Sequence, residues 1–210
     1  MDNLTNYISE IKEFNATAEY HLKMISTDFA HNMLIYGIIL ASKPEKVLEI
    51  GIGSGLGTRA ILSALDYNNQ GKLNCVDSFV DYVTLGHVTD DSVTPKIVKD
   101  LNKHKRVKII QSTEEDFVAS CKTNSYDLVV SDADHNHYQI WAEEIFRITK
   151  NNGFIFLHDV GDNDENAYIN IAKSRNISWY RFNQTTIINE ITNPDLERTF
   201  RGMLMIINKK

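Results

Sequence analysis

The chain has 210 residues, of which 42% are hydrophobic and 24% are charged, as expected for one soluble domain with a substantial core. Its formal net charge of −6, from 22 basic and 28 acidic residues, argues against a broad nucleic-acid-binding surface. The longest apolar run, Met33 to Ala41, is far shorter than the roughly 20 residues that a membrane-spanning helix needs. The N-terminus lacks the layout of a signal peptide, and the two cysteines lack metal-binding spacing. We therefore expect a cytoplasmic protein without nucleic-acid or membrane partners.

The spacing of apolar residues predicts helices over residues 4–42, a region that Pro44 closes. Beyond it, strands and helices alternate. Strands are predicted at 46–50, 72–76, 107–110, 127–131, 154–157, 177–182 and 203–207, and helices at 58–66, 94–103, 137–149 and 165–175, with a further helix opening at the capping-box pattern of residues 112–115. This alternation predicts an α/β fold with a mainly parallel sheet covered on both faces. We divide the chain into an N-terminal helical extension, residues 1–42, and one α/β domain, residues 43–210.

The most informative segment is residues 47–58, Val-Leu-Glu-Ile-Gly-Ile-Gly-Ser-Gly-Leu-Gly-Thr, where an apolar strand pattern meets four glycines at every second position. Glycines allow positive φ and let a ligand approach the main chain closely. In open parallel sheets, ligands bind outside the carboxyl ends of the strands. The segment therefore predicts a strand, a tight turn and a helix that together hold a nucleotide-like cofactor.

The acidic residues near this turn indicate which cofactor it holds. Asp77 lies about 20 residues past the last glycine, where a carboxylate can accept both hydroxyls of a ribose. An NAD-dependent oxidoreductase would share this geometry, but the dinucleotide fingerprint fits only the late frame from Gly55 to Ala60. Glu49, two residues before the first glycine, would repel a diphosphate. It suits the sulfonium and ammonium of S-adenosylmethionine, and the NAD enzyme is kept as the alternative.

Residues 47–55 resemble the first motif of class I S-adenosylmethionine-dependent methyltransferases, and Asp77 matches their ribose acid. Residues 131–138 and 153–160 resemble the small-molecule O-methyltransferases related to catechol and caffeoyl-coenzyme A methyltransferases, and more closely the bacterial relatives with an Asp-Gly-Asp-His-x-Tyr motif. The resemblance implies a doubly wound, seven-stranded Rossmann-like sheet whose last strand, 203–207, is antiparallel. It also implies cofactor contacts from strand-end residues, namely Glu49, Gly51, Gly53, Ser54, Gly55, Asp77, Ser78, Ser112, Thr113, Glu114 and Asp132.

Catechol-type relatives hold a divalent cation with carboxylates at the ends of the fourth and fifth strands, and they use a lysine base. Here Asp132 and Asp159 match the two carboxylates, and oxygen ligands of this kind suit Mg²⁺. The asparagine ligand of those relatives is matched by Val160, and the lysine by His135. His135 can take a proton from a hydroxyl or, together with His158, ligate a softer cation. The catalytic candidates are therefore His135 and Asp132, and the metal candidates are Asp132, Asp159 and His158.

The resemblance further implies a small-molecule acceptor with a hydroxyl group. We expect its pocket to be formed by residues 1–42, by residues 78–94 and by the loop after Asp159. The histidines outside the motifs are expected to be solvated or singly bonded, and these are His21, His31, His87 and His104. Because Val160 replaces the asparagine, a catalytically silent cofactor-binding protein on the same fold is a further alternative. A homodimer is compatible with the sequence, which does not define the oligomeric state.

Overall fold

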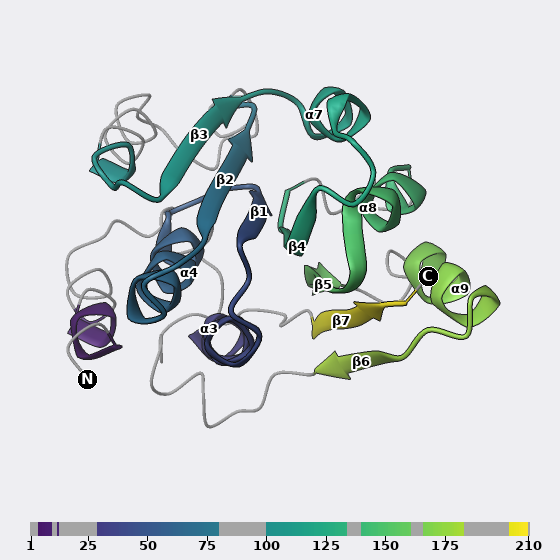
Figure 1. The fold of residues 1–210 in the computed structure, drawn as a ribbon, viewed down its shortest axis with the longest axis horizontal. Helices are drawn as coiled ribbons and strands as arrows, with labels where there is room; N and C mark the ends of the chain where they lie inside the picture. Colours follow the sequence, from purple (N-terminus) through teal and green to yellow (C-terminus); the bar gives the residue numbers. More distant parts are fainter. Residues whose placement is uncertain are drawn as a thin grey trace.

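The computed structural model describes residues 4–9, 12, 29–79, 100–133, 140–160, 166–182 and 202–209. The described residues form a seven-stranded sheet with helices on both faces (Figure 1). The strands are β1 (Lys46–Ile50), β2 (Lys72–Asp77), β3 (Val107–Gln111), β4 (Tyr126–Ser131), β5 (Thr149–Val160), β6 (Trp179–Phe182) and β7 (Gly202–Asn208). The labelled helices are α3 (Phe29–Ser42), α4 (Leu56–Tyr67), α7 (Glu114–Ser120), α8 (Ala142–Ile148) and α9 (Asn166–Ser174). Among the described helices, none has both the length and the apolar character that crossing a membrane requires.

The strand order across the sheet is β3-β2-β1-β4-β5-β7-β6. The strands β1 to β5 pair in parallel, whereas β7 runs antiparallel to both of its neighbours, β5 and β6. This arrangement confirms the predicted doubly wound sheet with an antiparallel last strand. From β1 the chain adds β2 and β3 on one side of the sheet and β4 and β5 on the other, so the strand order reverses between β1 and β4. Ligands in open α/β sheets bind at such a reversal. The topology therefore places the glycine segment, which follows β1, at the expected binding edge.

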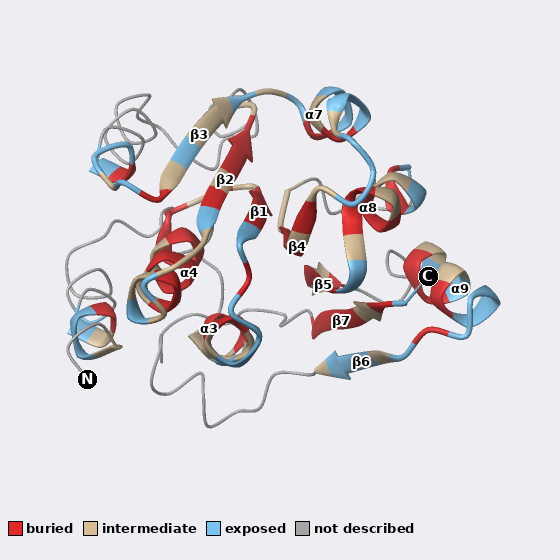
Figure 2. Ribbon diagram, in the orientation of Figure 1, coloured by how far each residue is buried: buried red, intermediate tan, exposed pale blue. Residues whose placement is uncertain are grey.

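Each strand alternates its side chains between two apolar layers. On one face, Val47, Leu128 and Phe156 pack with residues of α3 and α4. On the other face, Leu48 and Ile155 pack with residues of α8 and α9, and Figure 1 shows these two helices opposite α3 and α4. Figure 2 shows that the buried residues concentrate in the central strands, while the edge strands β3 and β6 are mostly intermediate or exposed. The core thus supports the middle of the sheet, where the site lies.

The observed strands mostly agree with the predicted ones, but the region around α8 differs. β1 has its predicted bounds, and β2, β3, β4 and β7 agree within one residue at each end. The predicted helix over 137–149 begins only at Ala142 in the part of it that is described. Its helical spacing predicts that Ile140, Ile145 and Ile148 face inward; the last two are buried, but Ile140 is 58% exposed. β5 is longer than predicted, and its register against β4 shifts between Thr149 and Phe154, around Asn152, which has a φ of 62°. Residues 94–99 of a predicted helix lie outside the described residues.

Candidate functional site

A tight turn of residues 51–55, called here the glycine turn, joins β1 to α4. Gly51, Gly53 and Gly55 have φ values of 87°, 51° and 78°, in the left-handed region that favours glycine. A Cβ atom added to Gly51 would lie 2.2 Å from the backbone carbonyl oxygen of Asp132, just beyond β4. The Asp132 amide also donates to the carbonyl of Ile50 at 2.8 Å. The glycine at position 51 is therefore required by contact with the protein backbone after β4, and a contact of Gly51 with the cofactor stays a prediction.

Asp77, at the end of β2, lies directly beside the glycine turn. Its Oδ2 accepts a hydrogen bond from the amide of Ile52, and its Oδ1 accepts one from the amide of Phe79, both at 2.9 Å. A carboxylate oxygen has two acceptor sites, so these bonds orient the group without saturating it by themselves. Asp77 is 8% exposed, and Ser78 after it is half-buried. The structure thus holds Asp77 in a fixed orientation at the predicted ribose position.

Glu49 is buried on the face of the sheet that α4 covers. Its Oε2 accepts hydrogen bonds from the Thr58 hydroxyl at 2.7 Å and from the Cys75 thiol at 3.1 Å. Burial raises the pKa of Glu49 from its ordinary 4.5 to about 8, against the opposing effect of these two hydrogen bonds. The nearby carboxylates of Asp132 and Asp77 add to the rise in this pKa. A positively charged ligand close to Glu49 would reverse this shift because it favours the ionised form.

The predicted cofactor residues after β3 have structural partners within the protein. The Thr113 hydroxyl accepts from the Asp116 amide at 3.2 Å and so caps α7, one residue later than the predicted capping box at Ser112. The buried side chain of Glu114 accepts from the Ser131 hydroxyl at 3.0 Å, which ties the start of α7 to the end of β4. The loop is therefore held in place at the binding edge, and contacts of Ser112, Thr113 and Glu114 with a cofactor stay a prediction.

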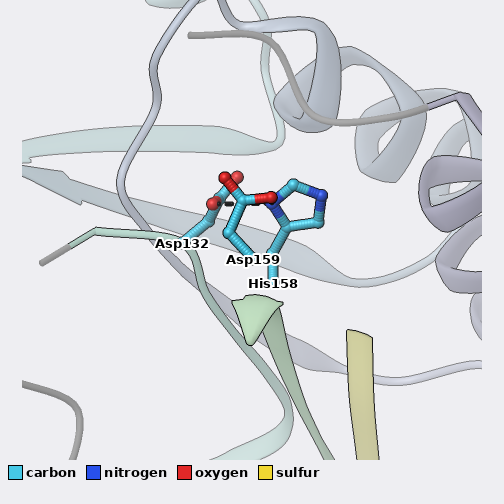
Figure 3. Close-up of side chains that lie close together, drawn as sticks. All are labelled: Asp132, His158 and Asp159. Atoms are coloured by element: carbon cyan, nitrogen blue, oxygen red, sulfur yellow. Dashed lines mark hydrogen bonds and ion pairs between the residues drawn. The ribbon is translucent and has the colours of Figure 1, made fainter. Parts of the chain in front are cut away.

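A second group of side chains, the Asp–His cluster, consists of Asp132, His158 and Asp159. Val130 of β4 pairs with Phe156 of β5, and since parallel strands keep their register, Asp132 and His158 meet two residues further on. The His158 Nδ1 lies 2.9 Å from Asp132 Oδ1 and 3.4 Å from Asp159 Oδ1. Figure 3 shows this nitrogen facing both carboxylates while the other ring nitrogen points away. The predicted metal candidates are thus brought together.

Helix α3 adds a residue that sequence reasoning missed. The ring of His31 packs against the ring of His158 with a centroid distance of 5.0 Å and an interplanar angle of 78°. Both side chains are buried, at 3% and 2% exposure. His31, expected to be solvated or singly bonded, is therefore buried and not solvated, because α3 carries it onto the sheet beside the Asp–His cluster. No local spacing in the sequence links residue 31 to residue 158.

The Asp–His cluster fits a divalent cation in its chemistry. Each of its three side chains offers one ligand atom, and these atoms all lie within 4.8 Å of one another. The set comprises two carboxylates and one imidazole. Val160, which matches the asparagine ligand of the catechol-type relatives, is fully buried in the apolar layer that includes Tyr168, and it offers no ligand atom. His135, the predicted base, lies outside the described residues.

The sheet order, the glycine turn and the oriented acid at the end of β2 form the arrangement with which Rossmann-like enzymes bind adenosine-containing cofactors. The family described as "Methyltransferase domain" matches residues 48–160, more than half of the chain, and the chain belongs to this family. The match includes the glycine turn, Asp77 and the Asp–His cluster. It confirms the prediction of a methyltransferase.

Several solved structures share the fold. The O-methyltransferase from Bacillus cereus in complex with SAH matches over 97% of this chain and 91% of that chain, with a TM-score of 0.68 and 14% identity. SAH-bound PaMTH1 from Podospora anserina matches over 97% and 88%, with a TM-score of 0.66 and 16% identity. TomG from Streptomyces achromogenes, an O-methyltransferase involved in tomaymycin synthesis, in complex with SAM, matches over 96% of each chain, with a TM-score of 0.66 and 11% identity. Comparison with curated protein sequences gives no match.

Proposed function

We propose that this protein transfers the methyl group of S-adenosylmethionine to a hydroxyl oxygen of a small molecule. The observation that carries the proposal is the glycine turn beside the oriented carboxylate of Asp77, in a chain that belongs to a methyltransferase family. The similar structures from Bacillus cereus and Streptomyces achromogenes are O-methyltransferases in complex with SAH and SAM. They support both the donor and the kind of acceptor atom.

The residues of the cofactor edge have distinct roles in this proposal. Asp77 accepts hydrogen bonds from the ribose hydroxyls, and the amides of Ile52 and Phe79 orient its carboxylate for this contact. The carboxylates of Asp77 and Asp132 give the edge a negative potential that suits a cationic donor, and the buried carboxyl of Glu49 ionises when such a donor binds close to it. A diphosphate would meet repulsion from the same groups. The electrostatics therefore favour S-adenosylmethionine over NAD.

Methyl transfer needs an acceptor oxygen held in line with the sulfonium and relieved of its proton. S-adenosylmethionine supplies the methyl group: an oxygen–carbon bond forms as the sulfur–carbon bond breaks, and the electron pair stays on sulfur. The hydroxyl proton passes to a base, for which His135 is our candidate. The Asp–His cluster would hold a divalent cation, whose charge lowers the pKa of a bound hydroxyl. Asp132 directly follows β4, and His158 and Asp159 lie among the last residues of β5, so the cluster lies at the same edge as the proposed donor site.

A cytoplasmic location is part of the proposal. Both cysteines are free, and Cys75 is buried as the hydrogen-bond donor to Glu49. Cysteines that stay unpaired suit a reducing compartment. Cell fractionation of the native host with an antibody against the chain tests this point, and recovery outside the cytoplasmic fraction would overturn it.

The activity is tested by incubating the purified protein with methyl-labelled S-adenosylmethionine and a panel of phenols, catechols and sugar alcohols. We expect release of S-adenosylhomocysteine that depends on an acceptor hydroxyl, and a methoxy signal in the product by NMR. The methyl ether of each reactive acceptor is the matched control and should give no turnover. Binding of NAD without binding of S-adenosylmethionine would favour the oxidoreductase. Tight binding of S-adenosylmethionine without turnover on any acceptor would favour the silent cofactor-binding protein.

A further inference from the structure

We infer that the Asp–His cluster is a site for a nitrogen-binding transition metal ion, with His158 as a ligand and His31 as the residue that positions it. The inference rests on the proposed function, because a metal ion assists there by binding the acceptor hydroxyl. It differs from what the resemblance implies, which is an oxygen-only site suited to Mg²⁺. The ligand class is a divalent first-row ion such as Co²⁺ or Zn²⁺.

The ligand atoms of the cluster indicate which kind of metal ion it prefers. The His158 Nδ1 faces Asp132 Oδ1 at 2.9 Å and Asp159 Oδ1 at 3.4 Å, so one ion placed among these atoms would meet a nitrogen and two oxygens. Imidazole suits ions such as Zn²⁺ and Co²⁺, whereas Mg²⁺ prefers oxygen ligands in near-ideal octahedral geometry. A mixed set with a buried imidazole therefore shifts the preference of the site away from Mg²⁺.

In this protein, the side chain of residue 160 supplies no oxygen ligand to the cluster. Val160 is fully buried, and it packs in the apolar layer on the α8 and α9 face of the sheet. His158 precedes it by two residues and contacts His31 on the face that α3 covers. The amide oxygen that the catechol-type relatives place after the second carboxylate is thus replaced here by an apolar contact. His158, from the position before that carboxylate, takes over as the third ligand.

His31 fixes the orientation of the His158 ring. A ring that packs edge to face against another ring limits its rotation, and the 5.0 Å centroid distance with a 78° angle is such a contact. Burial of both rings removes the freedom that an exposed histidine would have. Ligand orientation by neighbouring groups strengthens metal affinity by roughly ten- to a hundredfold in known sites. His31 therefore holds His158 with Nδ1 toward the carboxylates.

The chain offers a matched control in His104. Its Nε2 lies 2.8 Å from Asp66 Oδ2, so it too is a histidine beside a carboxylate. Asp66 is, however, also bonded to the guanidinium of Arg106 at 2.7 Å, and the pair is far more exposed than His158. A guanidinium on the same carboxylate opposes a cation. Replacement of His104 should leave metal binding unchanged.

The experiment measures metal binding directly on the full chain, without donor or acceptor. Equilibrium dialysis gives the affinities for Co²⁺, Zn²⁺ and Mg²⁺, and the visible spectrum of bound Co²⁺ reports its ligands. We expect Co²⁺ and Zn²⁺ to bind more tightly than Mg²⁺. In His158→Asn, which supplies an oxygen in place of the nitrogen, we expect the Zn²⁺-to-Mg²⁺ affinity ratio to fall at least tenfold. An unchanged ratio in this variant would overturn the assignment of His158.

Two variants test His31 separately. We expect His31→Phe, which keeps a ring against His158, to retain the Co²⁺ spectrum and most of the affinity. We expect His31→Ala to lose about tenfold in Co²⁺ affinity and to alter the spectrum. Thermal unfolding without metal identifies a variant that fails to fold. Equal loss in both variants would make His31 a ligand itself and overturn its positioning role, and no loss in either would remove it from the site.

Failure of this inference and failure of the proposed function are separable. If the protein binds none of the three ions yet methylates an acceptor in the presence of chelator, the metal site is wrong and the proposed methyltransferase function stands. If the protein binds Co²⁺ through His158 but does not bind S-adenosylmethionine, the metal site stands and the proposed function is wrong.

Discussion

The site has two halves that are held together by different means. The cofactor half, made of the glycine turn and Asp77, is fixed by backbone groups: two amides orient Asp77, and Gly51 abuts the backbone after β4. The other half, which we propose to face the acceptor, is made of the Asp–His cluster and His31 and is fixed by contacts between side chains. Backbone contacts tolerate few residue types, whereas side-chain contacts can be changed one ligand at a time. The first half therefore defines the class of enzyme, and the second can diverge within it.

The largest loss of stability and cofactor binding is expected from Gly51→Ala, which disrupts the backbone contact of the cofactor half. A side chain at a φ of 87° costs about 1–2 kcal/mol, and the added Cβ would lie 2.2 Å from the Asp132 carbonyl oxygen, so the free energy of unfolding should fall by at least about 3 kcal/mol. Binding of S-adenosylmethionine should be lost. Chemical denaturation and calorimetry measure the two quantities.

Gly37→Ala is the matched control for this prediction. A Cβ atom at Gly37 meets nothing within 4 Å, and the residue lies in the interior of α3. Because alanine favours a helix over glycine by roughly 0.5–1 kcal/mol, this variant should unfold at equal or higher denaturant concentration. Similar losses in both variants would contradict the claim that backbone packing at Gly51 holds the cofactor half.

A moderate effect is expected from pH, through Glu49. The pKa of Glu49 is raised to about 8, so the ligand-free protein keeps this carboxyl protonated below that pH. A cation favours the ionised form, so binding of S-adenosylmethionine releases the proton, and the affinity should increase as pH rises toward 8, by at most about tenfold per pH unit. The increase should be absent in Glu49→Gln. Calorimetry from pH 6 to 8 decides the matter, and an equal slope in both proteins would show that Glu49 is not coupled to the donor.

The smallest effect is expected from Thr113→Ala. The Thr113 hydroxyl caps α7, so its loss should cost about 1 kcal/mol of unfolding free energy, and Thr113→Ser should restore it. If the residue acts through the cap, S-adenosylmethionine affinity changes little in either variant. A large loss of affinity in Thr113→Ala with unchanged stability would instead make the side chain a direct cofactor contact, as the sequence predicted.

The same division explains what the sequence could predict. The bounds of β1 to β4 and of β7 and the placement of Asp77 follow from apolar runs and glycine spacing within short stretches, and these predictions agree with the structure. The meeting of Asp132 and His158 could be predicted because they directly follow the strands predicted at 127–131 and 154–157, whose carboxyl ends lie at one edge of a parallel sheet. His31 could not, since it reaches the cluster only through the packing of α3 on the sheet. Ile140 was misplaced because a helical period was extended through a turn.

The central claim, that S-adenosylmethionine binds over the glycine turn with its ribose on Asp77, is tested most directly by calorimetry on two aspartate variants. Asp127, at the start of β4 and the opposite edge of the sheet, accepts hydrogen bonds from the amides of Glu45 and Lys46, much as Asp77 accepts from two amides. Asp77→Asn should weaken S-adenosylmethionine binding by about a hundredfold, the effect of losing two hydrogen bonds to a charged group. Asp127→Asn should leave the affinity unchanged. Equal affinities in the two variants would contradict the account.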